Sequence, residues 1–542
     1  MGSCTAGQMH CEGMVLQTCV DGQFKDDQTC AYACVESLGC QVCAPNVGEC
    51  QGSVAHTCNA SGTGYTDTNC DPLLGETCDG GLCTGPCAPQ QIGKSYIGCE
   101  YYPTITGNEV DDNFAFAVAV SNTSTDPADV TIDGGGIGAP IKFTVQPGDV
   151  KAQPLPWNDL KLCHANGSFG GCGGTQNKND YLAAKGAFHL RSNRPVTVYQ
   201  FSPLDYGTGG SFSYTNDASL LIPVNAWTGS YVVAAYPAWT FSGGGVYPGL
   251  MTITASKDNT HLTIISKTTT PGGPSSPVMM QNIPTDVTLN AGDALELQTY
   301  AGDFTGSLVS ADQPVQVIGG HDCTFVPPTI GYCDHLEESM FPVETLSTKY
   351  VIAAPSVPAA GFENGKVEVV RIVGTAAGTK LTYDPPQVGA PTVVPNGGFV
   401  EIKNNKESFF VSANHKVLVS QYMEGQDAGG NTGDPAMAIA VAVDQYRMSY
   451  LFHAPTNYEV NYVQITAPVG ATVMLDGAAV TDTFTPIGSS GFAVARTKLS
   501  NAGTGNHSMT GDMPFGIQVY GYGQYTSYWY PGGLNLVDIP VN

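Results

Sequence analysis

The sequence predicts an all-β protein, built from tandem β-sandwich (Ig-like) domains in series behind a small disulfide-rich N-terminal region. Composition points this way, since 66 Gly and 36 Pro among 542 residues supply many turns and only 13% of residues are charged. Short β-branched runs such as residues 314–318 (PVQVI) recur between turn residues, which is typical of strands. Fourteen of the 18 cysteines fall within the first 99 residues, which predicts a separate cross-linked region.

Two groups of six cysteines stand in tandem at the start of the chain, and the gaps between cysteines begin with 7 and 8 residues in both. Modules this small cannot bury a sufficient apolar core, so we expect three disulfides in each, with the pairing inside a module left open. Zinc is the weaker alternative, because only Cys40 and Cys43 form a close pair and only His10 and His56 lie nearby. The first module (1–41) holds Cys4, Cys11, Cys19, Cys30, Cys34 and Cys40, and the second (42–86) holds Cys43, Cys50, Cys58, Cys70, Cys78 and Cys83.

The six other cysteines also form neighbouring pairs along the chain. We expect Cys87 to pair with Cys99, Cys163 with Cys172, and Cys323 with Cys333. An even cysteine count with this density indicates an oxidising compartment, so the sequence predicts a secreted, extracellular or cell-surface protein.

Four longer blocks follow the modules. Each opens at a tyrosine before an apolar run, and these tyrosines lie 100 to 135 residues apart, which suits a sandwich of about seven to nine strands. A β-propeller is the competing architecture, but its blades of about 40 to 50 residues are much shorter than these intervals. Each block closes with a strand that we expect to begin at a proline or lysine. The blocks are 87–229, 230–348, 349–448 and 449–542, the opening tyrosines Tyr96, Tyr231, Tyr350 and Tyr450, and the closing positions Pro195, Pro314, Lys416 and Pro514.

Charge excludes some partners. A formal net charge of −26 leaves no basic stripe for nucleic acid and disfavours an anionic membrane surface. No apolar run of about 18 residues is present, so we expect no membrane-spanning segment.

The most enzyme-like cluster is His321, Asp322, Asp334 and His335, with Glu337 and Glu338, around the loop between Cys323 and Cys333. These side chains could bind a metal or carry out acid/base chemistry, which makes a metal-dependent hydrolase one hypothesis. The favoured interpretation is structural, with the acids facing water or capping a short helix, because no common catalytic motif appears. We therefore assign no catalytic residue and no cofactor.

Two further sets of residues are weak ligand candidates. Asp111 and Asp112 lie in an acid-rich loop that could hold Ca²⁺, although the spacing does not match an EF-hand. Near the C-terminus, rings that could stack on a sugar are interspersed with glycines, and the alternative is that they cover the core of the last sandwich. These rings belong to Tyr522, Tyr525, Tyr528, Trp529 and Tyr530.

Several motifs together resemble the IgGFc-binding protein N-terminal domain family over about residues 90–535. They are 333–338 (CDHLEE), 433–437 (GDPAM), 475–477 (LDG), 514–516 (PFG), 520–522 (YGY), 527–528 (SY) and 530–533 (YPGG). The cysteine modules look more like those of bacterial, myxobacteria-like members. The resemblance implies an extracellular, non-catalytic binding or adhesion protein whose partner is a protein or a glycan. Self-association into a surface filament or sheath is the alternative, since exposed strand edges can add strands.

Overall fold

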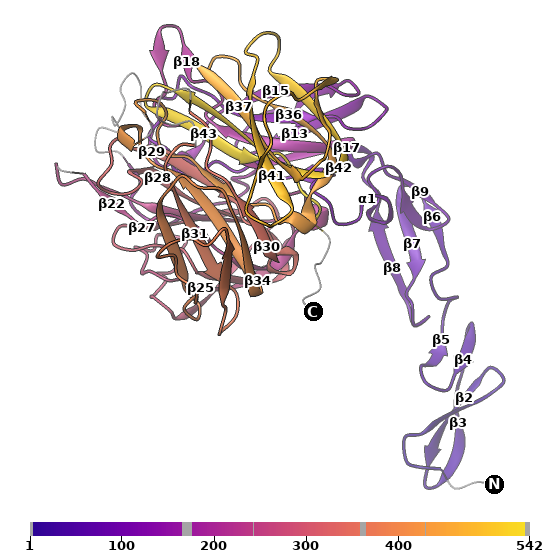
Figure 1. Cartoon of the computed structure of the whole chain (residues 1–542). Helices are drawn as coiled ribbons and strands as arrows, with labels where there is room; N and C mark the ends of the chain where they lie inside the picture. Colours follow the sequence, from indigo (N-terminus) through magenta and orange to yellow (C-terminus); the bar gives the residue numbers. More distant parts are fainter. Residues whose placement is uncertain (1–3, 165–175, 242, 358–364, 429, 537–542) are drawn as a thin grey trace. The chain divides into compact units, whose positions relative to one another are not determined.

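The computed structural model describes residues 4–164, 176–241, 243–357, 365–428 and 430–536. Strands dominate this part of the chain, and its helices are short, so the prediction of an all-β fold with a disulfide-rich N-terminal region is confirmed. The chain divides into two units, residues 1–92 and 93–542 (Figure 1).

The first unit consists of short antiparallel strands linked by turns. Its buried apolar residues are mostly cystines, with Leu16 and Ala55 beside them. The elements are β1 (Met9–Glu12), β2 (Val15–Val20), β3 (Gln23–Thr29), β4 (Ala33–Val35), β5 (Gly39–Gln41), β6 (Gly48–Gln51), β7 (Val54–Cys58), β8 (Tyr65–Asn69), η1 (Pro72–Leu74), β9 (Thr77–Asp79), β10 (Leu82–Thr84) and α1 (Pro89–Ile92).

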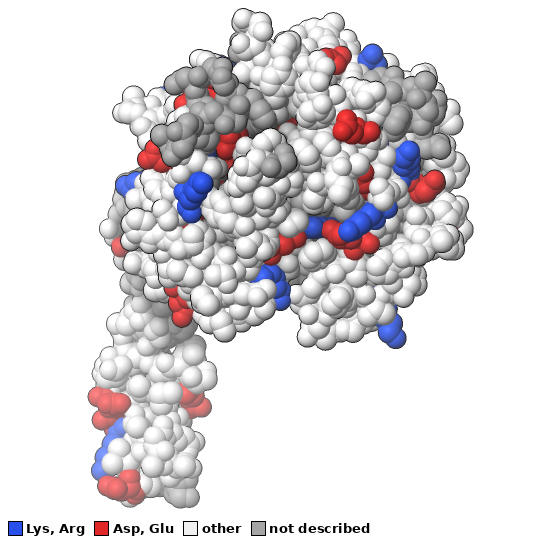
Figure 2. All heavy atoms as spheres, turned by 90° about the vertical axis from the view of Figure 1, so that its left-hand side faces the viewer, with Lys and Arg blue, Asp and Glu red and all other residues white. Residues whose placement is uncertain are grey.

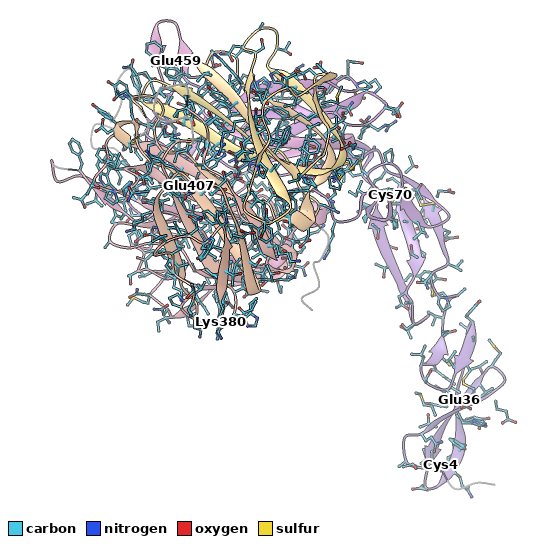
Figure 3. The ribbon with its side chains drawn as sticks, in the orientation of Figure 1. Cys4, Glu36, Cys70, Lys380, Glu407 and Glu459 are labelled. Atoms are coloured by element: carbon cyan, nitrogen blue, oxygen red, sulfur yellow. A yellow bond between two sulfur atoms is a disulfide. The ribbon has the colours of Figure 1, made fainter. Side chains whose placement is uncertain are left out.

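Both six-cysteine modules have the same disulfide connectivity. Figure 3 draws their side chains as sticks with sulfur in yellow, and labels Cys4 in the first module and Cys70 in the second. In each module the first cysteine pairs with the third, the second with the fifth and the fourth with the sixth. The repeated gaps in the sequence therefore correspond to one repeated cross-linked structure. The bonds are Cys4–Cys19, Cys11–Cys34 and Cys30–Cys40 in the first module, and Cys43–Cys58, Cys50–Cys78 and Cys70–Cys83 in the second.

The second unit contains four large antiparallel sheets, which follow one another along the chain apart from β16, which joins the second sheet. The first sheet comprises β11 (Gly98–Tyr101), β12 (Phe116–Ser121), β13 (Ala128–Gly134), β14 (Ile141–Val145), β15 (Val150–Leu155), β17 (Phe188–Ser202) and β20 (Asp217–Leu220). The second comprises β16 (Tyr181–Ala183), β21 (Thr228–Val232), β24 (Gly249–Ala255), β25 (Thr260–Ile265), β26 (Pro284–Leu289), β27 (Ala294–Thr299), β28 (Leu308–Thr324) and β29 (Asp334–Ser339).

The third and fourth sheets repeat this plan. The third comprises β30 (Ser347–Ile352), β31 (Glu368–Gly374), β32 (Leu381–Asp384), β33 (Phe399–Asn405), β34 (Phe409–Met423) and β35 (Met437–Ile439). The fourth comprises β36 (Arg447–His453), β37 (Val460–Pro468), β38 (Val473–Leu475), β39 (Ala478–Ala479), β40 (Thr485–Pro486), β41 (Phe492–Leu499), β42 (Asn506–Gly523) and β43 (Thr526–Pro531). Small elements complete the unit: the hairpins β18 (Gly207–Thr208) with β19 (Ser211–Phe212) and β22 (Trp239–Thr240) with β23 (Val246–Tyr247), and the 3₁₀ turns η2 (Asp159–Lys161), η3 (Val224–Ala226), η4 (Val343–Thr345), η5 (Gln426–Ala428) and η6 (Val443–Gln445).

A tyrosine near the start of each block ties its opening strand to its long closing strand. In the third block the Tyr350 hydroxyl accepts the Ser347 N–H at 3.0 Å and donates to the Val417 carbonyl at 2.7 Å. The same two bonds recur in the other blocks, and each acceptor carbonyl follows a bulge where the pairing register shifts. The equivalent residues are Tyr101, Tyr231, Tyr350 and Tyr450, with acceptors Val196, Val315, Val417 and Phe515.

This geometry corrects two details of the sequence analysis. In the first block the tyrosine with this role is Tyr101, and Tyr96 instead accepts the Tyr101 hydroxyl through its carbonyl at 3.1 Å. The closing strands also begin earlier than expected. For example, β28 starts at Leu308 and runs through Pro314, which lies in the bulge, where a missing N–H costs no ladder bond.

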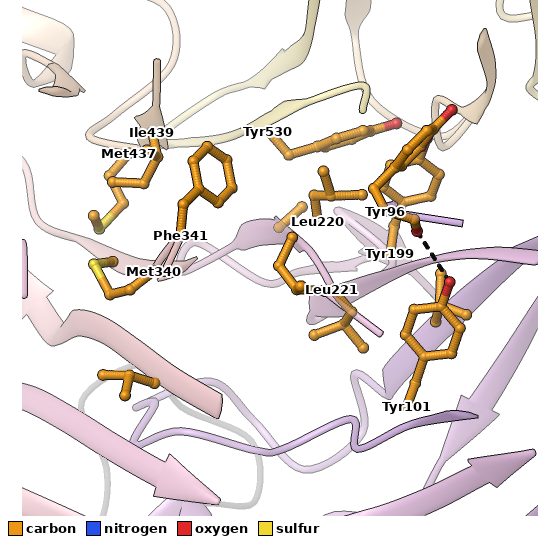
Figure 4. Packing of buried hydrophobic residues seen from close by; sticks show 14 of the residues in the cluster. Tyr96, Tyr101, Tyr199, Leu220, Leu221, Met340, Phe341, Met437, Ile439 and Tyr530 are labelled. Carbon is orange, nitrogen blue, oxygen red and sulfur yellow. Dashed lines mark hydrogen bonds between the residues drawn. The ribbon is translucent and has the colours of Figure 1, made fainter. Parts of the chain in front are cut away.

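The last short strand of each block lies at the centre of the unit. β20 packs against β29 and β43, and β35 packs against the same two strands, so the four strands form a ring. Their side chains belong to one large core that draws on all four blocks, and Figure 4 shows Leu220, Phe341, Ile439 and Tyr530 gathered there. The largest apolar cluster thus draws on all four blocks, while the third sheet also has a cluster of its own around Tyr350 and Phe409, and the division into four separate domains stays a prediction.

Candidate functional site

Aromatic side chains line a pocket of about 500 Å³ on the second unit. We call it the aromatic pocket. Ligand sites are typically apolar hollows of about 300–1,000 Å³ with a few fixed polar groups, which this pocket matches. Its lining consists of Tyr214, Trp239, Phe241, Tyr247, Phe325, Tyr332, Cys333, Asp434 and Tyr525.

Two short connections supply most of the rings. The hairpin of β22 and β23 pairs Trp239 with Tyr247, whose ring centroids lie 5.5 Å apart. The connection between β28 and β29 brings Phe325 against Trp239, with centroids 4.1 Å apart. The disulfide between Cys323 and Cys333 closes this connection at its base, with Cα atoms 5.3 Å apart. The cross-link therefore restrains the loop that carries the ring wall.

Tyr214 and Tyr525 enter the pocket from strained backbone positions. Their φ angles are +57° and +62°, a left-handed conformation that non-glycine residues seldom adopt. Tyr525 occupies the turn between β42 and β43, where its N–H donates to Gln426 Oε1 at 2.9 Å, and its ring lies edge-on to Tyr332 at 4.8 Å. Strain of this kind, roughly 1–3 kcal/mol per residue, clusters at functional sites, which favours a role for these rings in binding.

The rings differ in how much they offer to a ligand. Trp239 is only 7% exposed, whereas Phe241 and Tyr332 are 49% and 47% exposed. Large apolar side chains exposed together beside a hollow indicate an interaction site more often than a structural need. Phe241 and Tyr332 are therefore the most exposed ring surfaces of the three.

One carboxylate lies in the pocket wall. Asp434 is fully buried; its Oδ1 accepts the Gln426 N–H at 2.8 Å, and the backbone N–H of Tyr332 also stabilises the carboxylate. Burial raises the pKa of Asp434 to about 6, against the opposing charge of Lys366. Burial also lowers the pKa of Lys366 to about 8, and its Nζ donates to the carbonyls of Thr432 and Asp434 at 3.3 and 3.4 Å.

A second hollow, of about 570 Å³, is polar and borders the second and third sheets. Lys267, Asp303 and Phe399 contribute to its lining. Asp303 there accepts from the buried Arg371 at 2.8 Å, so that acid is already paired within the protein. The aromatic pocket is the better candidate site, because its lining is mostly ring surface.

The cluster around the Cys323–Cys333 loop is fully buried. His321, Asp322, Asp334 and His335 are each 0% exposed. Burial lowers the pKa of His321 to about 3 and raises that of Asp322, whose Oδ2 accepts from Gln176 Nε2 at 2.7 Å. The acids therefore neither face water nor cap a helix, contrary to the sequence expectation. A substrate could not reach these groups without rearrangement of the core.

Asp334 instead holds central strands together. Its Oδ1 accepts the Asn216 N–H at 2.6 Å, and its Oδ2 accepts the Thr526 hydroxyl and the Ser527 N–H at 2.9 and 3.0 Å. Burial raises the pKa of Asp334, and the nearby carboxyl of Asp434 adds to this shift. Asp334, one member of the cluster that looked most catalytic in the sequence, thus bonds to the segments before β20 and at the start of β43.

Asp217 makes a similar connection that sequence reasoning missed. Its carboxylate accepts N–H groups from β29 (Glu337, 3.1 Å), β35 (Met437, 3.0 Å) and β43 (Trp529, 3.1 Å). One side chain on β20 therefore bonds to each of the other three central strands. Burial raises the pKa of Asp217, and these N–H bonds oppose the shift. An acid at the head of the apolar run 217–224 was the signal that could have found it.

The sequence model of the IgGFc binding protein family matches residues 217–521, more than half of the chain. This chain belongs to the IgGFc binding protein family. The human IgGFc-binding protein is 26% identical over 248 residues, which are 45% of this chain and 4% of the human protein. The chain thus spans a small fraction of that relative's length, and the cysteine modules lie outside the family match. Their bacterial, myxobacteria-like origin stays a prediction.

The family match covers most of the aromatic pocket. Seven of its nine lining residues lie within 217–521, and Tyr214 and Tyr525 fall just outside that range. The candidate site is therefore built mainly on the family's own segment rather than on the N-terminal modules.

Four of the five aromatic side chains predicted as ligand-binding near the C-terminus are buried in the protein. Tyr522, Tyr528, Trp529 and Tyr530 are each 0% exposed, so protein atoms cover the faces that a sugar would need. Tyr525 alone among the five predicted residues lines the aromatic pocket. Burial removes the other four from a binding role, because the strands that carry them lie at the centre of the unit.

In the loop predicted to bind calcium, basic side chains already pair with one of the two acids. Asp112 forms ion pairs with the buried Lys161 and with His164, the latter at 3.1 Å. Asp111 Oδ1 accepts the Asn113 N–H at 2.9 Å. The described part of the chain contains no group of three or more His, Cys, Asp or Glu side chains suited to a metal. Calcium binding at Asp111 and Asp112 stays a prediction.

Besides Cys323 and Cys333, three described cysteines outside the modules are disulfide-bonded: Cys87, Cys99 and Cys163. The pairing of Cys87 with Cys99 stays a prediction, and Cys172, the expected partner of Cys163, lies outside the described residues.

None of the helices in the described ranges is long and apolar enough to cross a bilayer. Figure 2 shows that charged side chains are sparse on the face it displays, with acids and bases interspersed.

Proposed function

We propose that this chain is an extracellular, non-catalytic binding protein of the cell surface or its surroundings, and that the aromatic pocket takes up part of its ligand. The observation that carries the proposal is the pocket itself, with half-exposed Phe241 and Tyr332 beside a restrained loop. Family membership supports it, because the family and its human member are named for binding the Fc part of immunoglobulin G.

The disulfides support the extracellular location. Each N-terminal module depends on three cross-links, which persist in oxidising surroundings and are rare in the cytosol. The absence of catalysis is supported by the burial of His321 and His335, the two histidines on which the hydrolase hypothesis rests. Adhesion through a protein or a glycan is the form of binding that we propose. Self-association into a filament stays a prediction, which size-exclusion chromatography over a concentration series would test.

The test is a binding screen of the whole chain against Fc fragment, a glycan array and intact cells. We then expect the double variant Phe241→Ala/Tyr332→Ala to lose at least tenfold in affinity for the ligand found. Both side chains are half exposed, so the change leaves the core intact. Tyr32→Ala is the matched control, since Tyr32 is 49% exposed in the N-terminal unit. Full binding by the double variant would refute the assignment of the site.

A further inference from the structure

The polar content of the aromatic pocket points to the chemistry of its ligand. We propose that the pocket binds a cationic side chain, a lysine or arginine of a protein partner, between its rings. This inference rests on the proposed function, since it names the ligand group that the same pocket takes. The lining combines seven aromatic rings with a disulfide sulfur and one acid, Asp434, and contains no basic side chain.

Ring faces attract cations because the π-system carries negative charge on its face, and the attraction acts within about 6 Å of the ring centroid. Phe241 and Tyr332 present such rings at the mouth of the pocket, each about half exposed. An ammonium or guanidinium group on a flexible alkyl stem suits this arrangement, because the stem packs on the rings while the charge lies against their faces.

The charges around the pocket are negative on several sides. Asp434 lies in the wall, and because it is fully buried it acts through its charge. Exposed Asp427 lies beside the Tyr332 loop, where its N–H donates to the Gly331 carbonyl at 3.1 Å. Glu109 and Asp322 lie behind Tyr247, but burial raises the pKa of both and Lys161 faces them, so the acids that count for the pocket are Asp434 and Asp427.

The base that faces Asp434 behind the wall is Lys366. Lys366 is fully buried, donates to two backbone carbonyls and lies 5.1 Å from the ring centroid of Tyr522, a core residue. The positive charge of Lys366 offsets part of the negative charge of Asp434. Asp427, beside the Tyr332 loop, is exposed and keeps its own charge. The chain as a whole carries a net charge of −26, which attracts a basic partner at longer range.

A neutral sugar is the less favoured ligand. Sugar recognition needs several fixed hydrogen-bonding groups around the stacked ring, and here the wall supplies tyrosine hydroxyls and one buried carboxylate. A neutral ligand would also lack the charge attraction that the surrounding acids exert on a cation. The electrostatics therefore decide between two ligands that the rings alone would both accept.

Saturation-transfer NMR on the whole chain tests the inference with three probes. They are a capped pentapeptide with a central lysine, the same peptide with norleucine, and methyl β-glucoside. We expect the lysine peptide to bind at least tenfold more tightly than the norleucine peptide. Phe241→Ala/Tyr332→Ala should abolish this binding, and Asp434→Asn should weaken it about tenfold while keeping the bond to Gln426. Asp286→Asn, an exposed acid on β26, is the control and should change nothing.

Three results would overturn the inference. If norleucine or the glucoside binds as tightly as lysine and the double ring variant loses that binding, the pocket binds ligands but does not select a cation. If Asp286→Asn weakens binding as much as Asp434→Asn, the attraction is unspecific. If no probe binds, the cation is excluded, and the ligand screen described above decides separately whether the pocket binds anything.

Discussion

Replacing Tyr350 with phenylalanine is expected to destabilise residues 93–542 without altering their packing. The ring is 1% exposed, and phenylalanine fills the same space. What is lost is the hydroxyl, which accepts the Ser347 N–H at 3.0 Å and donates to the Val417 carbonyl at 2.7 Å. Both bonds span the bulge of β34, where the ladder between β30 and β34 shifts register. Water cannot replace them at a buried position.

The size of the effect follows from the two backbone groups left without a partner. A buried polar group without its hydrogen bond costs about 1–3 kcal/mol, so for two groups we expect a loss of about 2–6 kcal/mol in the free energy of unfolding. An unfolding entropy of roughly 2.1 cal/mol/K per residue gives about 0.9 kcal/mol/K for this unit, and hence a fall in Tm of about 2–7 °C.

Differential scanning calorimetry at pH 7, with disulfides intact, measures this shift. The fourfold repeat offers an internal check, because Tyr101→Phe, Tyr231→Phe and Tyr450→Phe remove equivalent bonds. Tyr332→Phe is the control, since that ring is 47% exposed. A change in Tm below about 0.5 °C in most of the four variants would refute the view that these hydroxyls fix the bulges.

Three further predictions concern the core acids and the modules. Asp217→Ala should lower stability by more than about 3 kcal/mol, seen as a large fall in Tm, because three strands lose the acceptor of an N–H group; Asp286→Ala should not. Burial raises the pKa of Glu368 to about 7, above its usual 4.5, so the folded state binds the extra proton. Its stabilising contribution is therefore complete below about pH 4.5 and lost as pH rises through 7, and Glu368→Gln should remove about 2 kcal/mol of the pH dependence of unfolding between pH 5 and 8. Reduction with dithiothreitol should unfold residues 1–92, whose core is mostly cystine, and hydrogen exchange that stays slow there after full reduction would contradict this.

The candidate site shows where sequence reasoning stopped. Cysteines Cys323 and Cys333 marked the loop that bears the ring wall, because they stand alone in their part of the chain and so have no competing partner nearby. The sequence also identified the acids beside these cysteines, but it did not predict that they are buried. A carboxylate that faces water and one that accepts N–H groups of strands cannot be distinguished from the sequence alone. Tyr525 stood in a run of aromatic residues, and nothing local separated it from its buried neighbour Tyr528.

Local patterns determined the strand-rich fold, the length of the repeated block and the cross-linked modules, because turn residues, alternation and cysteine spacing act over a few neighbouring positions. The tertiary structure alone decided that the last strands of the four blocks form one ring and that Asp217 joins them. It also assembled the aromatic pocket from segments hundreds of residues apart. Contacts between distant segments depend on how whole sheets pack, and no stretch of sequence contains that information by itself.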